Sequence, residues 1–156
     1  MNAPQILQFL TELTENNNRE WFAANKSRFD ELIPQIAAFD SSVAGLSGKE
    51  CVFRIYRDVR FSHDKSPYKT HFGAMIMAGK KKSEIHNKAG YYIHFEPGES
   101  ILAGGAYIPP SPWLKQIRSA IYFQPKEFTK IIKNPAFEKY IGEISGEKLS
   151  RPPQGF

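Results

Sequence analysis

Three blocks of residue patterning, in a fixed order, constrain the fold of this 156-residue chain more than any other feature. Apolar residues recur at helical spacing over residues 1–48 and 111–145, whereas residues 52–108 hold runs rich in aromatic and β-branched side chains. A strand-rich block between two helical blocks is typical of the α+β class, in which helices pack on an antiparallel sheet. The sequence therefore predicts a single α+β domain over residues 1–156, with residues 146–156 as a tail.

The first block predicts two helices. The first spans about Ala3–Glu15 and has Asn2 in the position of an N-cap. The second is capped by Asn17 and continues until Gly45 breaks it. Pro34 lies inside this second helix, and we expect it to kink or divide the helix because proline lacks an amide hydrogen.

The middle block predicts about four strands joined by short connectors. Strand-like composition covers Val52–Phe61, Tyr68–Met77, Tyr91–Glu96 and Ile101–Ile108. Connectors of this length favour antiparallel neighbours, so a meander is the expected topology. The last block predicts three further helices, which begin near Ser111, Pro125 and Pro135. We expect these helices to pack on the sheet together with the N-terminal ones.

Positive charge is concentrated in one part of the chain. The formal net charge is +5, yet residues 52–88 alone carry nine basic and three acidic side chains. A local excess of this kind is expected of a surface that faces an anionic partner. Cys51 is the single cysteine, which excludes an intramolecular disulfide, and no apolar run has the length of a membrane span. We therefore expect a cytoplasmic protein without a membrane partner.

Residues 53–72, called the motif segment below, interleave charged and apolar side chains more densely than a core strand needs. Alternation along the predicted strand places Arg57 on an apolar face, between Ile55 and Val59. A guanidinium keeps its charge when it is buried, so Arg57 is predicted to be largely buried in a structural ion pair. Its candidate partners are the carboxylates of Glu96, Asp64 and Asp58.

The opposite face of that strand is predicted to bind a ligand. It carries Arg54, Asp58 and Arg60, and arginine is suited to bidentate recognition of phosphate or carboxylate groups. Asp58 is the candidate catalytic acid or base, or else it orients the ligand. The other predicted ligand-binding residues, in the connector and the next strand, are Asp64, Lys65, Tyr68 and Lys69.

The charged positions of the motif segment also carry a family resemblance. They follow the pattern Arg54-x-x-Arg57-Asp58-x-Arg60-Phe61-x-x-Asp64-Lys65-x-x-Tyr68. This pattern resembles the signature of a bacterial family of conserved hypothetical proteins, and the resemblance covers most of the chain. It implies a distinct α+β domain with the motif as its functional centre, and a chain that is shortened at its C-terminus. It implies no particular reaction.

Three functions stay open from the sequence. The first is binding of an anionic small molecule, with hydrolysis or transfer at a phosphoryl or carboxyl group if the protein is an enzyme. The second is a non-catalytic interaction or structural module, in which the charges of the motif segment form an ion-pair network. The third is nucleic-acid binding, which the positive charge favours but for which no RNA-recognition core pattern is present.

No cofactor is predicted, and the histidines leave one alternative. The four histidines show no clustered metal-binding spacing. His71 and His94 lie on different predicted strands, however, and can meet across the sheet near Glu96 or Asp64. Such a group suits either a metal ion or a general base.

Overall fold

The computed structural model describes residues 1–38, 51–77, 82–144, 149–153 and 155. The chain divides into two compact units, Met1–Tyr107 and Ile108–Phe156. Within the described residues, the first unit carries three α-helices, a short 3-10 helix at Lys82–Asn87 and a sheet, and the second carries three α-helices. The predicted end of the second helix near Gly45 lies outside the described residues.

The N-terminal helices agree with the prediction at α1 and differ at the start of α2. Helix α1 spans Ala3–Glu15, and the Asn2 side chain caps it by accepting a hydrogen bond from an amide of the first turn at 3.3 Å. Helix α2 spans Arg19–Ala24 and is capped by Asn18. The prediction of Asn17 as the cap is wrong by one residue, because the Asn17 side chain hydrogen-bonds the motif segment instead.

The second predicted helix is divided at Asn25 and not at Pro34. Helix α3 spans Lys26–Ala38 and continues through Pro34. An interior proline costs about 3 kcal/mol, but Leu32 and Ile36 on either side of it are buried. Burial of two such side chains contributes roughly 3–6 kcal/mol, which outweighs the cost of the proline.

The sheet has three strands among the described residues and forms the predicted antiparallel meander. Strands β1, β2 and β3 span Phe72–Met77, Gly90–Phe95 and Ile101–Gly105, in that spatial order. The expectation of about four strands exceeds the observed number by one. The first expected strand, residues 52–61, contributes only two isolated bridges, from Val52 to Ala74 and from Tyr56 to Tyr68.

A shift of register explains why the first expected strand does not pair regularly. The Phe53 amide donates to the Gly73 carbonyl at 2.8 Å. Two residues further along, the Lys69 amide donates to the Ile55 carbonyl, also at 2.8 Å. Arg54 alone therefore lies opposite the three residues between Lys69 and Gly73. We call this arrangement the bulge, because extra residues on one side interrupt a ladder and re-aim the side chains beside it.

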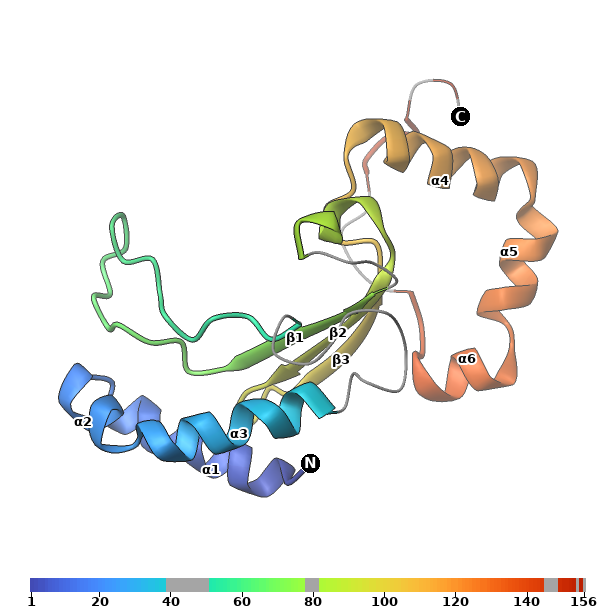
Figure 1. The fold of residues 1–156 in the computed structure, drawn as a ribbon. Coiled ribbons are helices and arrows are strands. Elements are labelled where there is room, and N and C mark those ends of the chain that lie inside the picture. Colours follow the sequence, from blue (N-terminus) through green and yellow to red (C-terminus); the bar gives the residue numbers. More distant parts are fainter. Residues whose placement is uncertain (39–50, 78–81, 145–148, 154, 156) are drawn as a thin grey trace. The chain divides into compact units, whose positions relative to one another are not determined.

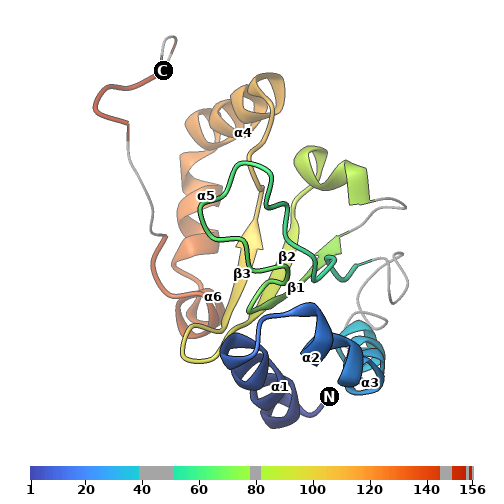
Figure 2. The ribbon, with the colours of Figure 1, turned by 90° about the vertical axis from the view of Figure 1, so that its left-hand side faces the viewer.

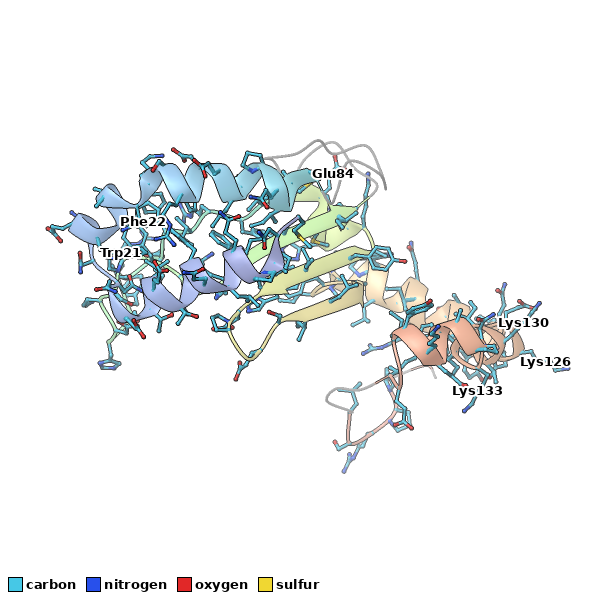
Figure 3. All side chains as sticks on the ribbon, turned by 90° about the horizontal axis from the view of Figure 1, so that it is seen from below. Trp21, Phe22, Glu84, Lys126, Lys130 and Lys133 are labelled. Carbon is cyan, nitrogen blue, oxygen red and sulfur yellow. The ribbon has the colours of Figure 1, made fainter. Side chains whose placement is uncertain are left out.

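One face of the sheet packs against the helices. Figure 1 shows α1 and α3 on the same side of the three strands, and the motif segment projecting from the end at which β1 begins, toward the viewer in Figure 2. Figure 3 shows Trp21 and Phe22 at the α2 end of the helical layer. Buried residues of both layers form one core, which includes Ile6, Phe9, Leu10, Leu13, Leu32, Ile36, Phe72, Ala74, Ile93 and Phe95.

The opposite face of the sheet, called the open face below, is not covered by these helices. Register and alternation place on it Gly73, Met75, Tyr92, His94 and Ala103. Phe53 packs against the β1 side of this face. The pairing of β1 with β2 therefore brings His71, which directly precedes β1, close to Tyr92 and His94 of β2 on the face that the helices leave available.

The second unit contains α4 at Ser111–Phe123, α5 at Pro125–Ile132 and α6 at Pro135–Tyr140, which confirms the three predicted helix starts. No residue of these helices is buried. Figure 3 shows side chains that project outward along α5 and at its end, those of Lys126, Lys130 and Lys133. The packing of this unit on the sheet, and with it the single domain, stays a prediction. Among the described helices, none combines the length and the apolar character that crossing a bilayer requires.

Candidate functional site

Arg57 is the centre of a small hydrogen-bonded group in the motif segment. Its guanidinium donates to the Asp64 carboxylate, to the Ser66 hydroxyl and, at 3.4 Å, to the Ser62 hydroxyl. Of the three carboxylates considered from the sequence, the structure thus pairs Arg57 with Asp64. The Arg57 side chain is 27% exposed, so it is half-buried rather than largely buried, because the strand expected to enclose it does not form.

Asp58 and Arg60 form a second ion pair that lies in solvent. Arg60 Nε donates to Asp58 Oδ1 at 2.9 Å, and Arg60 Nη2 donates to Asp58 Oδ2 at 2.6 Å. The hydrogen bonds from Arg60 lower the pKa of Asp58, which makes its carboxylate a weaker base. The acid–base role of Asp58 stays a prediction, and this pairing gives it no support.

Two other predicted ligand-binding residues have partners within the fold. Lys65 Nζ donates to the Val59 carbonyl at 2.9 Å. Tyr68 is 5% exposed, and its ring stacks on Phe22 with the centroids 4.0 Å apart. The backbone of Tyr68 exchanges two hydrogen bonds with the Asn17 side chain, at 3.0 and 3.1 Å. Tyr68 thus anchors the motif segment to the helical layer.

Arg54 and Lys69 lie at the bulge and differ from the other charged residues of the motif segment. Neither has a carboxylate partner in an ion pair within the described part of the chain. Burial lowers the pKa of Lys69, and the Arg54 guanidinium lowers it further. Arg54 is also a minor cause of the lowered pKa of Asp58, whose oxygens are bonded to Arg60. The bulge therefore holds two cations to which no carboxylate of the described residues is directly bonded.

The ion pair between Arg57 and Asp64 predicts a specific acid sensitivity. Hydrogen bonds from Arg57, and then from Ser66, lower the pKa of Asp64 to about 2 from an ordinary value of 3.8. Because the pKa is lower in the folded chain than in the unfolded one, this pair stabilises the fold fully above about pH 4 and loses its effect as the pH falls toward 2. We expect Asp64→Asn to lower the denaturant midpoint at pH 6, with a deficit that shrinks between pH 4 and pH 2.

Denaturant unfolding of both proteins from pH 2 to pH 6 measures this effect. Glu99→Gln is the control, because Glu99 is exposed and has no ion pair among the described residues. A deficit of the Asp64 variant that is the same at pH 2.5 and at pH 6 would show that the lost stability does not come from the charge of Asp64.

Two histidines and one glutamate converge on the open face next to the bulge. The rings of His71 and His94 stack with their centroids 4.4 Å apart. His94 Nε2 lies 2.7 Å from Glu96 Oε2. One donor atom from each of the three residues lies within 4.8 Å of the other two, and no other group of metal-ligating type was found among the residues that the structure describes. We call these three residues the His–Glu cluster.

The surroundings of the His–Glu cluster favour a neutral His71. Burial lowers the pKa of His71 below its ordinary value of 6.5, and the His94 ring adds to this effect. Glu96 acts in the opposite direction, and Lys69 is a smaller cause that lowers the pKa. These effects favour the neutral form of His71, which offers a nitrogen lone pair to a proton or a metal ion.

Tyr92 connects the His–Glu cluster with an apolar pocket. Its hydroxyl hydrogen-bonds His94 Nδ1 at 2.9 Å. A Cβ atom on Gly73 would lie 2.6 Å from that hydroxyl oxygen, so the glycine provides the space for this contact. Tyr92 also lines a pocket of about 560 Å³ together with Phe53, Met75, His86, Ala103 and Tyr107. This volume is in the usual range for small-molecule sites, which are mostly apolar with a few polar groups.

The sequence indicates that His71, His94 and Glu96 can meet, but Tyr92 and the space at Gly73 were not predicted. A signal for Tyr92 was present, because alternation along a strand puts residues 92 and 94 on one face. No local sequence pattern indicates the bulge, because it depends on how two distant segments of the chain pair.

The fold and the site together define a class of protein. It is an α+β protein whose antiparallel sheet, with three strands among the described residues, is covered by helices on one face and carries a polar cluster on the other. Over residues 5–156 the chain matches the family described as "Conserved hypothetical protein (DUF2461)", and it belongs to that family. Comparison with curated proteins and with solved structures gave no match.

Proposed function

We propose that this protein binds a small anionic molecule, bearing a phosphate or a carboxylate group, at Arg54 and Lys69. The observation that carries the proposal is the bulge, which places Arg54 opposite the residues that directly follow Lys69, with no carboxylate in an ion pair with either cation among the described residues. An anion between them would relieve their repulsion, and the arginine fork suits its oxygens. Because Lys69 is half-buried, its attraction to an anion is screened less than at a fully exposed position.

The other cations of the motif segment have a supporting role in this proposal. Arg60 and Lys65 are exposed, and each already has a hydrogen-bond partner within the motif segment. They add to the positive field that draws an anion toward the bulge. Asp64 acts indirectly, because its pairing with Arg57 orders the loop that precedes Lys69.

The His–Glu cluster supplies groups that can move protons beside this anion site. Lys69 lies two residues before His71 and lowers its pKa, which supports the two proposed sites being neighbours. A neutral imidazole is a suitable general base at pH 7. This arrangement supports hydrolysis or group transfer as the type of reaction. In such a reaction His71 is a better candidate for the general base than Asp58.

Titration with inorganic phosphate tests the binding proposal. We expect Arg54→Ala and Lys69→Ala each to weaken phosphate binding by about tenfold or more, since a hydrogen bond to a charged group contributes about 1.5–3 kcal/mol. Isothermal titration calorimetry at low and at physiological salt gives the affinities. Arg118→Ala and Lys115→Ala remove the same charges from the second unit and are the matched controls.

Phosphate affinities that are equal in the wild type and in both bulge variants would contradict the proposal. The motif segment would then be the ion-pair network of a structural or protein-interaction module, an alternative that the pairs Arg57–Asp64 and Asp58–Arg60 favour. Binding of an arbitrary oligonucleotide that falls steeply with salt, and that both bulge variants lose, would instead identify a nucleic acid as the partner.

A further inference from the structure

We propose that the His–Glu cluster of His71, His94 and Glu96 binds a divalent transition-metal ion of the Zn²⁺ type. This site takes a cation, and its three residues are not the cations Arg54 and Lys69 of the proposed anion site. The two proposals can therefore be tested, and can fail, separately. A bound ion would use the His71 lone pair, so the role of His71 as a general base applies to the protein without metal.

The donor atoms of the cluster are those of a known type of metal site. Two imidazole nitrogens and one carboxylate oxygen form the protein ligands of many catalytic zinc sites, and they leave one coordination position for water or substrate. With metal–ligand distances of about 2.0–2.2 Å, tetrahedral donor atoms lie roughly 3.4 Å apart. The three donor atoms of the cluster already lie within 4.8 Å of one another. Side-chain movements of roughly 1 Å bring them to the spacing that the ion needs.

The backbone holds the three ligands on neighbouring, hydrogen-bonded segments. His94 lies in β2, and Glu96 follows the end of that strand with its side chain on the same face. His71 directly precedes β1 and lies two residues before Gly73, which pairs with His94. One ligand thus lies in a strand and the other two directly beside a strand end, where they keep their geometry better than they would in a free loop.

Hydrogen bonds from outside the cluster orient two of the ligands. The Tyr92 hydroxyl contacts His94 Nδ1 and leaves Nε2 directed toward Glu96. The Thr70 hydroxyl donates to Glu96 Oε1 at 3.5 Å, so that Oε2 is the oxygen that faces His94. Metal-binding histidines normally have such a partner on the second ring nitrogen. A tyrosine hydroxyl can donate to Nδ1 or accept from it, so it supports His94 in either tautomer.

A structural hydrogen bond between His94 and Glu96 explains only part of the arrangement. It does not require a second imidazole, yet the His71 ring stacks directly on His94. His71 is half-buried and has no hydrogen-bond partner among the described residues. The His71 ring takes no part in the hydrogen bond between His94 and Glu96. Binding of a metal ion would give all three side chains the same role, that of a ligand.

Titration of chelator-treated protein with Zn²⁺ tests the site. Isothermal titration calorimetry is expected to show one Zn²⁺ ion per chain, and Co²⁺ in its place is expected to give the visible absorption of a four-coordinate ion. We expect His71→Ala, His94→Ala and Glu96→Gln each to weaken Zn²⁺ binding by more than about 100-fold, since these changes remove a ligand rather than its support. His63→Ala and His86→Ala remove the other two histidines and are expected to leave the affinity unchanged.

Tyr92→Phe tests the positioning role of the hydroxyl. Phenylalanine keeps the ring that lines the pocket and removes only the contact with His94. We expect Zn²⁺ binding to weaken by about 10- to 100-fold while the stoichiometry and the form of the Co²⁺ spectrum are retained.

Two results would overturn the proposal. One is Zn²⁺ binding by Glu96→Gln with wild-type affinity, and the other is loss of the ion in the His63 or His86 variant. Glu96→Gln preserves the size of the side chain and one acceptor oxygen while it removes the charge, so it gives an answer even where His94→Ala fails to fold. Phosphate binding of the same variant, measured without metal, shows whether the anion site is intact when the metal site is lost.

Discussion

Replacing Phe9 by alanine is expected to lower the free energy of unfolding by about 3–5 kcal/mol, which is the usual cost of removing a buried phenylalanine ring. Phe9 is 1% exposed and lies at the junction of the helices and the sheet. Its ring centroid lies 5.6 Å from that of Trp21, 6.3 Å from that of Phe29 and 6.1 Å from that of Phe72. Alanine would leave a cavity between α1 and β1 that these neighbours can fill only in part.

The size of this effect is a large fraction of the total stability of a domain, which is about 5–15 kcal/mol. Guanidinium chloride unfolding followed by circular dichroism and by tryptophan fluorescence measures it. Phe61→Ala is the matched control, because Phe61 is 95% exposed and its removal is expected to change the stability by no more than about 0.5 kcal/mol. Equal midpoints for the two variants would show that Phe9 does not join the helices to the sheet.

The parts of the fold that could be predicted from the sequence are those fixed by local chemistry. Asn2 caps α1, and Pro125 and Pro135 open α5 and α6, at the positions that short-range rules indicate. The strands β2 and β3 follow from composition and from short connectors. Each of these features depends on residues within about one turn or one strand, so a single sequence carries the whole signal.

The parts that could not be predicted depend on contacts between distant segments. Residues 52–61 have the composition of a strand, but the bulge at Arg54 breaks their pairing with the segment around Lys69. Local alternation contains no information about such a shift of register, because it depends on which residue of one segment faces which residue of the other. Pro34 illustrates the same point, since packing of its neighbours overrides a local rule.

The sequence predicted which charged residues the motif segment offers, but not which of them lie together. Strand parity placed Arg54, Asp58 and Arg60 together as one ligand-binding face. The structure instead pairs Asp58 with Arg60 and places Arg54 near Lys69 at the bulge. Without the expected regular strand, the charges form two ion pairs, and Arg54 and Lys69 have no ion-pair partner among the described residues. The functional proposal consequently moves from the whole motif segment to its bulge and to the sheet face beside it.

Asn17→Ala is expected to release the motif segment from the helical layer and to lower the free energy of unfolding by about 2–4 kcal/mol. The Asn17 side chain donates to the carbonyl of Tyr68 and accepts from its amide, across 51 positions of sequence. Tyr68 is 5% exposed, so both backbone groups would lose their partners where water has little access. Each unsatisfied group of this kind costs about 1–3 kcal/mol.

Asn18→Ala separates this effect from ordinary helix capping. Asn18 caps α2 by accepting from the Trp21 amide at 2.8 Å, and its loss is expected to cost only about 1 kcal/mol. Asn17→Asp keeps the acceptor but not the donor and is expected to fall between the two alanine variants. Hydrogen exchange of the Tyr68 amide gives a local measurement, in which Asn17→Ala should exchange much faster than Asn18→Ala.

Asn17→Ala is also expected to affect both proposed sites, although Asn17 contacts neither of them. Tyr68 is followed directly by Lys69, and His71 lies three residues after Tyr68. Freeing the Tyr68 backbone therefore adds disorder to one cation of the anion site and to one ligand of the metal site. Binding must then order these residues, which lowers the affinity for both ions. We expect Asn17→Ala to weaken phosphate and Zn²⁺ binding together, whereas Arg54→Ala weakens phosphate alone and Glu96→Gln weakens Zn²⁺ alone. Wild-type affinity of Asn17→Ala for both ions, combined with fast exchange at Tyr68, would show that the anchor stabilises the fold without positioning either site.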